Sequence, residues 1–358
     1  MQCANLGGTE QSALNQMIGL QRRGHTCRVI SVHPLGKLAP LLESHDINAV
    51  GCSYEGKFGW RSHLELRRRI RNQPGEATLM TGPTLTGIMA LKDRNRKRQV
   101  LAVHFHHEGV KPRWQWRLLY WLAMRKFKAV TFPSDFVRRE AESIYPPLAS
   151  VTKTVRNPIR MPSDVSQGQK EKARQSLGLP LDAPIVGNAG QLIERKRFDV
   201  FLKTAQQIIE VHPRTIFLIA GDGPKRGDWE RLAEQLGISD SVHWLGWKEE
   251  LGNFYQSLDV LLFNSDWDAL GMTPVEAMSF ATPVVASVQN GGLDEIISSP
   301  TVGHLFQEHD PSVLAQTVSR LVADPEEATS LGQTGRSHVA ELCSMSRCAR
   351  TLEGLFLG

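Results

Sequence analysis

Residues 259–287, DVLLFNSDWDALGMTPVEAMSFATPVVAS, decide the fold of this chain. They predict a buried strand over residues 260–263, a polar loop, a helix that opens at Pro274, and a second buried strand over residues 283–286. Proline is tolerated in a first helical turn because its missing N–H has no intrahelical partner there. A strand, a helix and a strand in this order indicate a parallel α/β sheet, which binds ligands at the carboxyl ends of its strands.

The loop ahead of the predicted helix has the features of an anion site. The first N–H groups of a helix have no intrahelical partner and lie at the positive end of its dipole, so they suit a phosphate. Asp268 in the loop and Glu276 in the first helical turn bracket this point, and Gly271 lets a ligand approach the backbone. A carboxylate at a helix start can instead simply accept bonds from the N–H groups, but the combination favours a ligand site.

The same stretch, followed by NGGLDEII, resembles the donor-site signature of family 4 retaining glycosyltransferases of the GT-B fold. In that family two glutamates eight positions apart flank a glycine, and EAM, a Pro-Val strand and a GG-x-x-E segment follow. Asp268 and Glu276 occupy the two glutamate positions, so the first is an aspartate here, and Thr282 stands where the family has glycine. The resemblance implies an α/β protein with two Rossmann-like domains that face each other across a cleft.

Length and composition fit two domains of a soluble protein. The chain has 358 residues, more than one hydrophobic core usually supports, with 41% hydrophobic and 22% charged residues. No apolar run reaches the length of a membrane span, and five scattered cysteines make no metal-binding spacing. We therefore expect reduced thiols and a cytoplasmic location.

The charge is divided unevenly along the chain. Residues 1–160 hold 26 Lys and Arg against 11 Asp and Glu, and the remainder holds 16 against 26. A basic half favours nucleic acid, an acidic membrane surface or a phosphorylated acceptor, although part of the charge could complement the acidic half instead. No nucleic-acid-binding module is recognisable, so we expect no nucleic-acid partner.

The first half, residues 1–160, resembles the acceptor-side domain of the family. GGTEQSALNQMIGLQRRGHTCRVIS matches the family's opening of a glycine loop, a helix and a strand, which places Gly7 and Gly8 at the donor phosphates. The family has a full hydrophobic strand before this loop, whereas MQCANL is short and polar. We therefore expect a missing or very short first strand, and favour a natural start upstream of Met1.

Three histidines, His104, His106 and His107, follow a predicted buried strand. No second ligand cluster accompanies them, so we expect no zinc. The resemblance implies that a histidine here faces the donor sugar across the cleft; His104 matches that place best, and His106 is the second choice. Arginines at positions 67, 68, 69 and 71 and the basic, aromatic segment 111–128 predict either solvated helix faces or docking to anionic lipid or glycan.

The second half, residues 161–340, begins with a polar connection and then alternates strands and helices regularly, as a parallel α/β domain does. Residues 341–358 predict a helix that packs back toward the first domain. Segment 190–197, GQLIERKR, resembles the family pattern G-R-L followed by K-G. Lys196 matches the lysine and Arg195 replaces the charge lost at Gln191, whereas Arg197 stands where the family has glycine.

The resemblance gives these residues roles. Lys196 and Arg195 would offset the charge that grows on a diphosphate leaving group, Asp268 would hold a donor-sugar hydroxyl, and Glu276 would accept bonds from both ribose hydroxyls. The remaining donor-binding residues are Gly190, Gly246, Trp247, Gly271 and Met272, with the backbone near Gly246 reading the base. A D-x-D triplet, DWD at residues 266–268, lies within the segment that resembles the donor-site signature. We expect no cofactor and no divalent metal. As the donor we expect a UDP-sugar rather than a GDP-sugar.

These observations favour a retaining hexosyltransferase. It would move a sugar from a nucleotide-diphosphate sugar to a hydroxyl of a glycan or lipid-linked acceptor in cell-envelope polysaccharide synthesis, peripherally attached to an anionic membrane surface. Two alternatives stay open. One is a nucleotide-sugar hydrolase or epimerase of the same fold, and the other is a degenerate, non-catalytic relative that only binds nucleotide-sugars.

Overall fold

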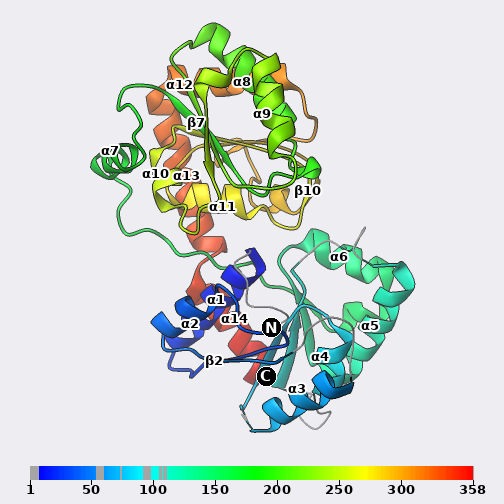
Figure 1. Ribbon diagram of the computed structural model, residues 1–358. Coiled ribbons are helices and arrows are strands. Elements are labelled where there is room, and N and C mark those ends of the chain that lie inside the picture. The colour runs from blue at the N-terminus through cyan, green and yellow to red at the C-terminus, as the bar shows by residue number, and fades with distance from the viewer. Residues whose placement is uncertain are drawn as a thin grey trace. The chain divides into compact units, whose positions relative to one another are not determined.

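The computed structural model describes residues 8–53, 60–72, 75–91, 98–104, 107 and 111–357. The chain divides into two compact units (Figure 1). The first unit combines Met1–Ile159 with Cys343–Gly358, and the second unit is Arg160–Leu342. The first unit is therefore assembled from two separate parts of the sequence.

The second unit is built on a six-stranded sheet in which all neighbours are parallel. Its strands are β7 (Ile185–Ala189), β8 (Ile216–Ala220), β9 (Val242–Gly246), β10 (Val260–Asp268), β11 (Val284–Gly291) and β12 (His304–Phe306). The order is β12-β11-β10-β7-β8-β9, so the chain runs outward from β7 to β9 and then continues with β10 on the other side of β7. This is the Rossmann order, and its switch point lies between β7 and β10.

Helices cover both faces of this sheet (Figure 1). They are α7 (Gln167–Ser176), α8 (Phe198–Val211), α9 (Arg226–Gln235), α10 (Gly252–Ser257), α11 (Met272–Ser279), α12 (Pro311–Ala323) and α13 (Pro325–Leu342). The main core lies between the sheet and α8, α9 and α12, where Phe201, Phe217 and Leu262 are fully buried. On the other face, Phe254 of α10 and Val275 of α11 are buried.

The decisive stretch folds differently from its prediction in three places: β10 and β11 extend further than expected, to Asp268 and Gly291, and α11 begins earlier. Strand β10 continues to Asp268, so the predicted loop after residue 263 is wrong. The continuation forms because residues 264–268 pair with β11, from Asn264 opposite Ser287 to Asp268 opposite Gly291. Helix α11 begins at Met272 rather than Pro274, since Gly271 adopts a left-handed φ of 81° directly before it. Glu276 therefore lies in the second helical turn, and not in the first.

The first unit contains, within its described residues, a four-stranded parallel sheet in the order β3-β4-β5-β6 and a parallel pair β1-β2. The strands are β1 (Arg28–Ser31), β2 (Asn48–Gly51), β3 (Thr78–Thr81), β4 (Gln99–Ala102), β5 (Ala129–Phe132) and β6 (Thr152–Thr154). The helices are α1 (Gly8–Gln21), α2 (Ala39–Ser44), α3 (Trp60–Asn72), α4 (Leu85–Ala90), α5 (Arg113–Lys126), α6 (Asp135–Ile144) and α14 (Met345–Leu357). Because α4, α5 and α6 each join neighbouring parallel strands, right-handed crossovers place all three on one face of the sheet.

Helix α14 completes the first unit by packing against α1. The two helices approach closely at Gly19, where an added Cβ would lie 2.8 Å from the carbonyl oxygen of Met345. Helix α1 begins at Gly8, which the sequence had assigned to the glycine loop. The expectation of a missing or very short first strand concerns residues 1–7, which lie outside the described residues.

Candidate active site

Three glycines form an open floor at the carboxyl ends of β7, β8 and β9. The Gly190 N–H donates to the Ala220 carbonyl, and the Gly221 N–H donates to the Gly246 carbonyl, each at 2.9 Å. Gly221 has a φ of 146°, and a Cβ on it would lie only 1.9 Å from the Gly190 oxygen. Position 221 therefore requires glycine, because the backbone of Gly190 packs directly against it. Gly221 was not predicted as a site residue, although its place directly after a buried strand is a signal.

Lys196 and Asp268 meet beside this floor. Lys196 ends the short 3₁₀ helix η3 (Glu194–Lys196), and its Nζ donates to Asp268 Oδ2. Their side chains are only 12% and 18% exposed, and Nζ also lies 4.7 Å from the centre of the Phe263 ring. Burial lowers the pKa of Lys196, which the attraction of Asp268 opposes. Asp268 therefore stabilises a positive charge in a partly desolvated place.

Arg195 adds a second positive charge at the same carboxylate. Its Nη1 donates to the Trp267 carbonyl at 3.1 Å and lies 3.8 Å from Asp268 Oδ2. Its guanidinium group stacks over the Trp267 ring, 4.3 Å from the centre. With Lys196 and Arg195 facing one carboxylate, the cluster has an excess positive charge that suits an anionic ligand.

The first turn of α11 borders the same strand ends. Thr273 Oγ1 donates to the Ala189 carbonyl at 3.0 Å, directly before Gly190 in the sequence. A Cβ on Gly271 would lie 2.9 Å from Leu293, so only glycine fits closely here. Met272 and Thr273 occupy the positions where a helix leaves N–H groups without intrahelical partners. The switch point thus brings a helix N-terminus, glycine backbone and two cations together.

Glu276 lies one turn further along α11 and accepts a hydrogen bond from the Tyr255 hydroxyl at 2.8 Å. Burial raises the pKa of Glu276 to about 7, and the bond from Tyr255 acts in the opposite direction. Burial also raises the pKa of Tyr255 well above 10, so this hydroxyl stays a donor. Tyr255 was not predicted as a site residue, because it lies on α10 and its partner Glu276 lies on α11.

Gly246 ends strand β9, and Trp247 follows it directly. Gly246 has a left-handed φ of 67°, and the Trp247 side chain is 49% exposed. A large aromatic ring that is half exposed next to open backbone can stack on a flat ligand ring.

His104 follows strand β4 in the first unit and is buried. Its Nδ1 lies 3.0 Å from Asn157 Oδ1, and burial lowers its pKa to about 4. The neutral ring donates from Nδ1 to Asn157, which leaves Nε2 as an acceptor without a partner among the described residues. Gly8 is exposed at the start of α1, whereas Gly7 lies outside the described residues.

His107 has an internal role. Its Nδ1 lies 2.6 Å from Glu140, and its Nε2 contacts the hydroxyl of Tyr120. Within the described ranges, no group of three or more His, Cys, Asp or Glu residues is arranged to hold a metal ion. His106 lies outside these ranges.

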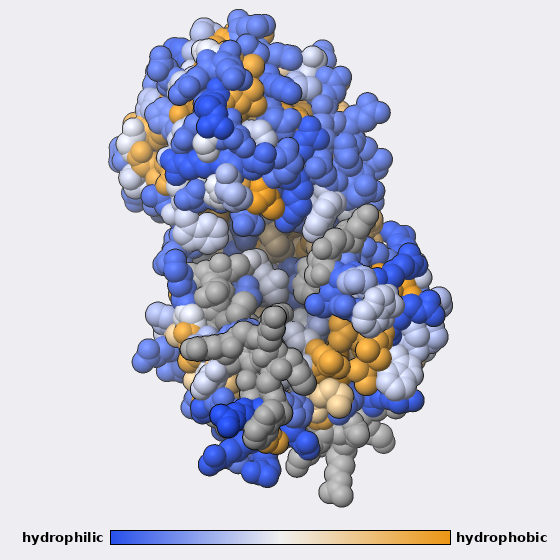
Figure 2. Space-filling view, turned by 45° about the vertical axis from the view of Figure 1, so that its right-hand side comes forward, coloured by the Kyte–Doolittle hydropathy of each residue, from blue (hydrophilic) through white to orange (hydrophobic). Residues whose placement is uncertain are grey.

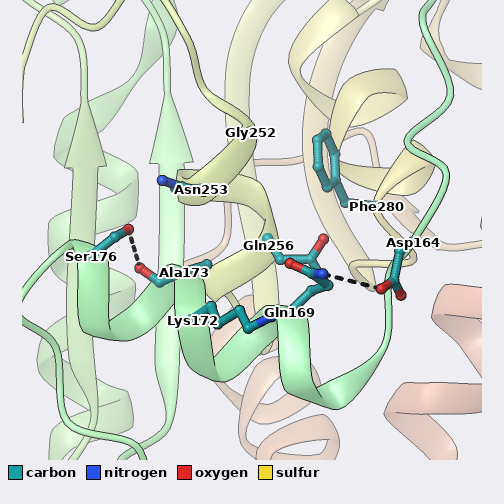
Figure 3. A pocket seen from close by; sticks show the side chains of 9 residues that line it. All are labelled: Asp164, Gln169, Lys172, Ala173, Ser176, Gly252, Asn253, Gln256 and Phe280. Atoms are coloured by element: carbon teal, nitrogen blue, oxygen red, sulfur yellow. Dashed lines mark hydrogen bonds between the residues drawn. The ribbon is translucent and has the colours of Figure 1, made fainter.

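A hollow of about 390 Å³ lies between α7 and α10, close to Phe280 at the far end of α11 (Figure 3). Its polar groups bond locally, as Gln169 does to Asp164 at 3.1 Å and Ser176 to the Ala173 carbonyl at 2.8 Å. The hollow is therefore separate from the site at the N-terminus of α11.

Comparison with solved structures defines the class of fold. The chain is similar to Anabaena HepE in complex with UDP and glucose, with a TM-score of 0.79 and 18% identity over 99% of this chain and 97% of that one. It is also similar to WaaG, a glycosyltransferase involved in lipopolysaccharide biosynthesis, with a TM-score of 0.72 and 15% identity over 100% and 98% of the two chains. The protein has the GT-B fold.

The family follows from the sequence comparisons. Residues 6–160 match the family described as Glycosyltransferase Family 4, and residues 169–338 match Glycosyl transferases group 1. The chain belongs to the group 1 glycosyltransferases of family 4. This confirms the resemblance drawn from residues 259–297.

Two curated relatives illustrate the family. A D-inositol 3-phosphate glycosyltransferase of Corynebacterium urealyticum is 33% identical over 52% of this chain and 46% of its own length. A lipopolysaccharide core biosynthesis glycosyltransferase of Rhizobium meliloti, LpsE, is 29% identical over 45% and 46% of the two chains. The matches thus span about half the length of the curated relatives.

Proposed function

We propose that the protein is a retaining glycosyltransferase that moves a sugar from a nucleotide-diphosphate sugar to an acceptor hydroxyl. The observation that carries this proposal is the contact of Lys196 with Asp268 at the switch point of the second unit. It lies beside Arg195 and the first turn of α11. This site therefore combines cations and a helix N-terminus, which suit a diphosphate, with a carboxylate, which suits a sugar hydroxyl.

The cations would act on the leaving group. A diphosphate gains negative charge as the glycosidic bond breaks, and fixed positive groups in a partly desolvated site stabilise that change most. Lys196 and Arg195 supply this charge from the protein, so the proposed reaction needs neither a cofactor nor a divalent metal. Asp268 accepts from Lys196 through Oδ2, and we assign a donor-sugar hydroxyl to the same carboxylate.

Glu276 would bind the ribose. Its Oε2 already accepts the Tyr255 hydroxyl, and an ionised carboxylate has further lone pairs for two ribose hydroxyls. Trp247 and the backbone at Gly246 would contact the base. UDP is the nucleotide we favour over GDP, supported by the UDP complexes of the structurally similar HepE.

In the first unit, we assign the unpartnered Nε2 of His104 to a hydroxyl of the donor sugar. A neutral imidazole that donates from Nδ1 to Asn157 can only accept at Nε2, so it suits a hydroxyl and not a carboxylate. We expect Gly8, together with Gly7, to lie at the donor phosphates.

The acceptor side carries a surface suited to an anionic membrane. The α4–α5 face exposes large apolar side chains, next to hydrophilic surface (Figure 2). They are Leu85, Met89, Trp114, Leu118 and Trp121. Helix α5 has no acidic residue, and the Arg125 guanidinium lies 3.6 Å over the Trp121 ring. Neighbouring α3 adds exposed arginines, namely Arg61, Arg67, Arg68 and Arg71.

Exposed tryptophans between arginines are typical of helices that lie at a membrane surface. We therefore propose a glycan or lipid-linked acceptor at the inner face of an anionic membrane, with the protein cytoplasmic and reversibly attached. The role in cell-envelope synthesis is supported by the lipopolysaccharide relatives LpsE and WaaG. None of the described helices has the length and apolar character of a membrane-spanning segment.

Saturation-transfer NMR with UDP-, GDP- and ADP-sugars tests the donor assignment. We expect signals from UDP-hexoses, lost in Glu276→Ala and kept in Glu234→Gln, which changes an exposed residue of α9. No binding of any nucleotide-sugar would contradict the proposal. Binding followed by release of free sugar without dependence on any acceptor would favour a hydrolase, and binding without turnover would favour a non-catalytic relative.

A further inference from the structure

The backbone of Arg197 is unusual. It joins η3 to α8 with φ 44° and ψ 45°, the left-handed conformation that side chains with a Cβ disfavour. The family pattern has glycine at this position, which adopts the conformation without penalty. Here an arginine adopts it, so other contacts must hold the turn.

Two carboxylates hold the Arg197 side chain. Its Nε and Nη2 donate to the two oxygens of Asp199 at 3.0 and 3.1 Å, a paired geometry that fixes the plane of the guanidinium group. Its Nη1 donates to Asp266 Oδ1 at 3.0 Å. Asp199 lies in the first turn of α8 and Asp266 lies on β10, so Arg197 ties its own turn to the sheet.

Asp266 is itself anchored through buried groups. The Nε2 of His309 lies 3.3 Å from Asp266 Oδ1, and its Nδ1 lies 2.7 Å from Ser287 Oγ. Ser287 accepts the side-chain amide of Asn264 at 2.8 Å. The His309 side chain is 5% exposed, and Asn264 and Ser287 are fully buried. These residues, Asp266, His309, Ser287 and Asn264, form an anchor that reaches from the surface into strands β10 and β11.

The anchor runs alongside the contact between Lys196 and Asp268. Residues two apart on a strand point to the same face, so Asp266 and Asp268 are neighbours on β10. They pair with the consecutive residues Arg197 and Lys196 of the turn. Displacing the Arg197 turn would therefore move Lys196 relative to Asp268.

We propose that Asp266, supported by His309, is a positioning residue that holds Lys196 against Asp268 through Arg197. Its effect on turnover rests on the proposed function, whereas its effect on the turn does not. In this chain the ion pair with Asp266 replaces the conformational freedom that glycine gives the family at position 197.

A double-mutant cycle of Asp266→Asn and Arg197→Gly tests this inference. In the wild-type background, Asp266→Asn should lower kcat about ten-fold and change the donor KM less than two-fold, because a displaced catalytic group lowers the rate more than binding. In the Arg197→Gly background, the glycine adopts the turn without an anchor. Asp266→Asn should then change kcat less than two-fold.

Amide hydrogen exchange of residues 194–198 gives a readout that needs no substrate. The Lys196 and Arg197 amides donate to the carbonyls of Ile193 and Glu194 at 3.0 Å. Asp266→Asn should speed exchange at these amides in the wild-type background, and should not do so in the Arg197→Gly background. His309→Gln should act in the same direction. Asp182→Asn, which breaks the exposed pair with Arg214, is the control and should leave these amides unchanged.

The inference would be overturned if Asp266→Asn lowered kcat equally in both backgrounds. It would also be overturned if Asp266→Asn left amide exchange unchanged in the wild-type background. Absence of transfer activity in the wild-type protein would instead contradict the proposed function. The exchange measurement would still decide whether Asp266 positions the turn.

Discussion

Glu276→Gln should make the protein more stable at alkaline pH. The pKa of Glu276 rises from 4.5 to about 7 on folding, mainly because of burial, so the folded state disfavours the ionised form. By linkage this ionisation costs about 3 kcal/mol at pH 8 and about 1 kcal/mol at pH 5. The cost is absent below the unfolded pKa and complete above the folded one. Glutamine removes the titrating group and keeps an acceptor for the Tyr255 hydroxyl.

Urea unfolding of the wild type and the variant at pH 5 and pH 8 measures this difference. We expect Glu276→Gln to be more stable by about 3 kcal/mol at pH 8, with the advantage falling to about 1 kcal/mol at pH 5. Glu234→Gln, at an exposed position, should stay within about 0.5 kcal/mol of the wild type at both values. An advantage that is equal at both pH values, or a less stable variant at pH 8, would refute the reasoning.

Three further outcomes are expected. Lys196→Ala should lower kcat more than donor affinity, because its charge matters most when the diphosphate leaves; a change in KM alone would contradict that role. Asp268→Glu should preserve or raise the transfer rate, whereas Asp268→Asn should lower it strongly because buried Lys196 loses its counter-charge. Equal rates for the wild type and both variants would exclude contact between Asp268 and the sugar. The protein should co-sediment with anionic but not neutral vesicles and should detach at high salt. Trp121→Ser should weaken this vesicle binding, whereas Leu181→Ser, a control in the second unit, should not. Equal binding to anionic and neutral vesicles would contradict the membrane proposal.

Much of the second unit could be predicted because its signals are local. The alternation of buried strands and helices gives the parallel sheet, and the glycines that follow strands lie at its carboxyl edge. The prediction was wrong at residues 264–268, where the polar residues indicated a loop. Pairing with β11 outweighs that local preference, and the extended strand carries Asp266 and Asp268.

Contacts between distant segments could not be predicted from one sequence. Nothing near Glu276 in the chain points to Tyr255, and nothing near Asp266 points to His309, which lies 43 residues away. The arginine at position 197 was visible as a departure from the family pattern. Only the backbone angles and the two carboxylates explain how the turn accommodates it.

The return of α14 to the first unit has a consequence for biosynthesis. The second unit is one continuous segment, Arg160–Leu342, so it can fold as soon as that segment has left the ribosome. The first unit has to wait for α14, whose Met345 packs on Gly19 and whose Glu353 pairs with Arg23 at 2.7 Å. Although its first part is made first, the amino-terminal unit is therefore the last to be completed.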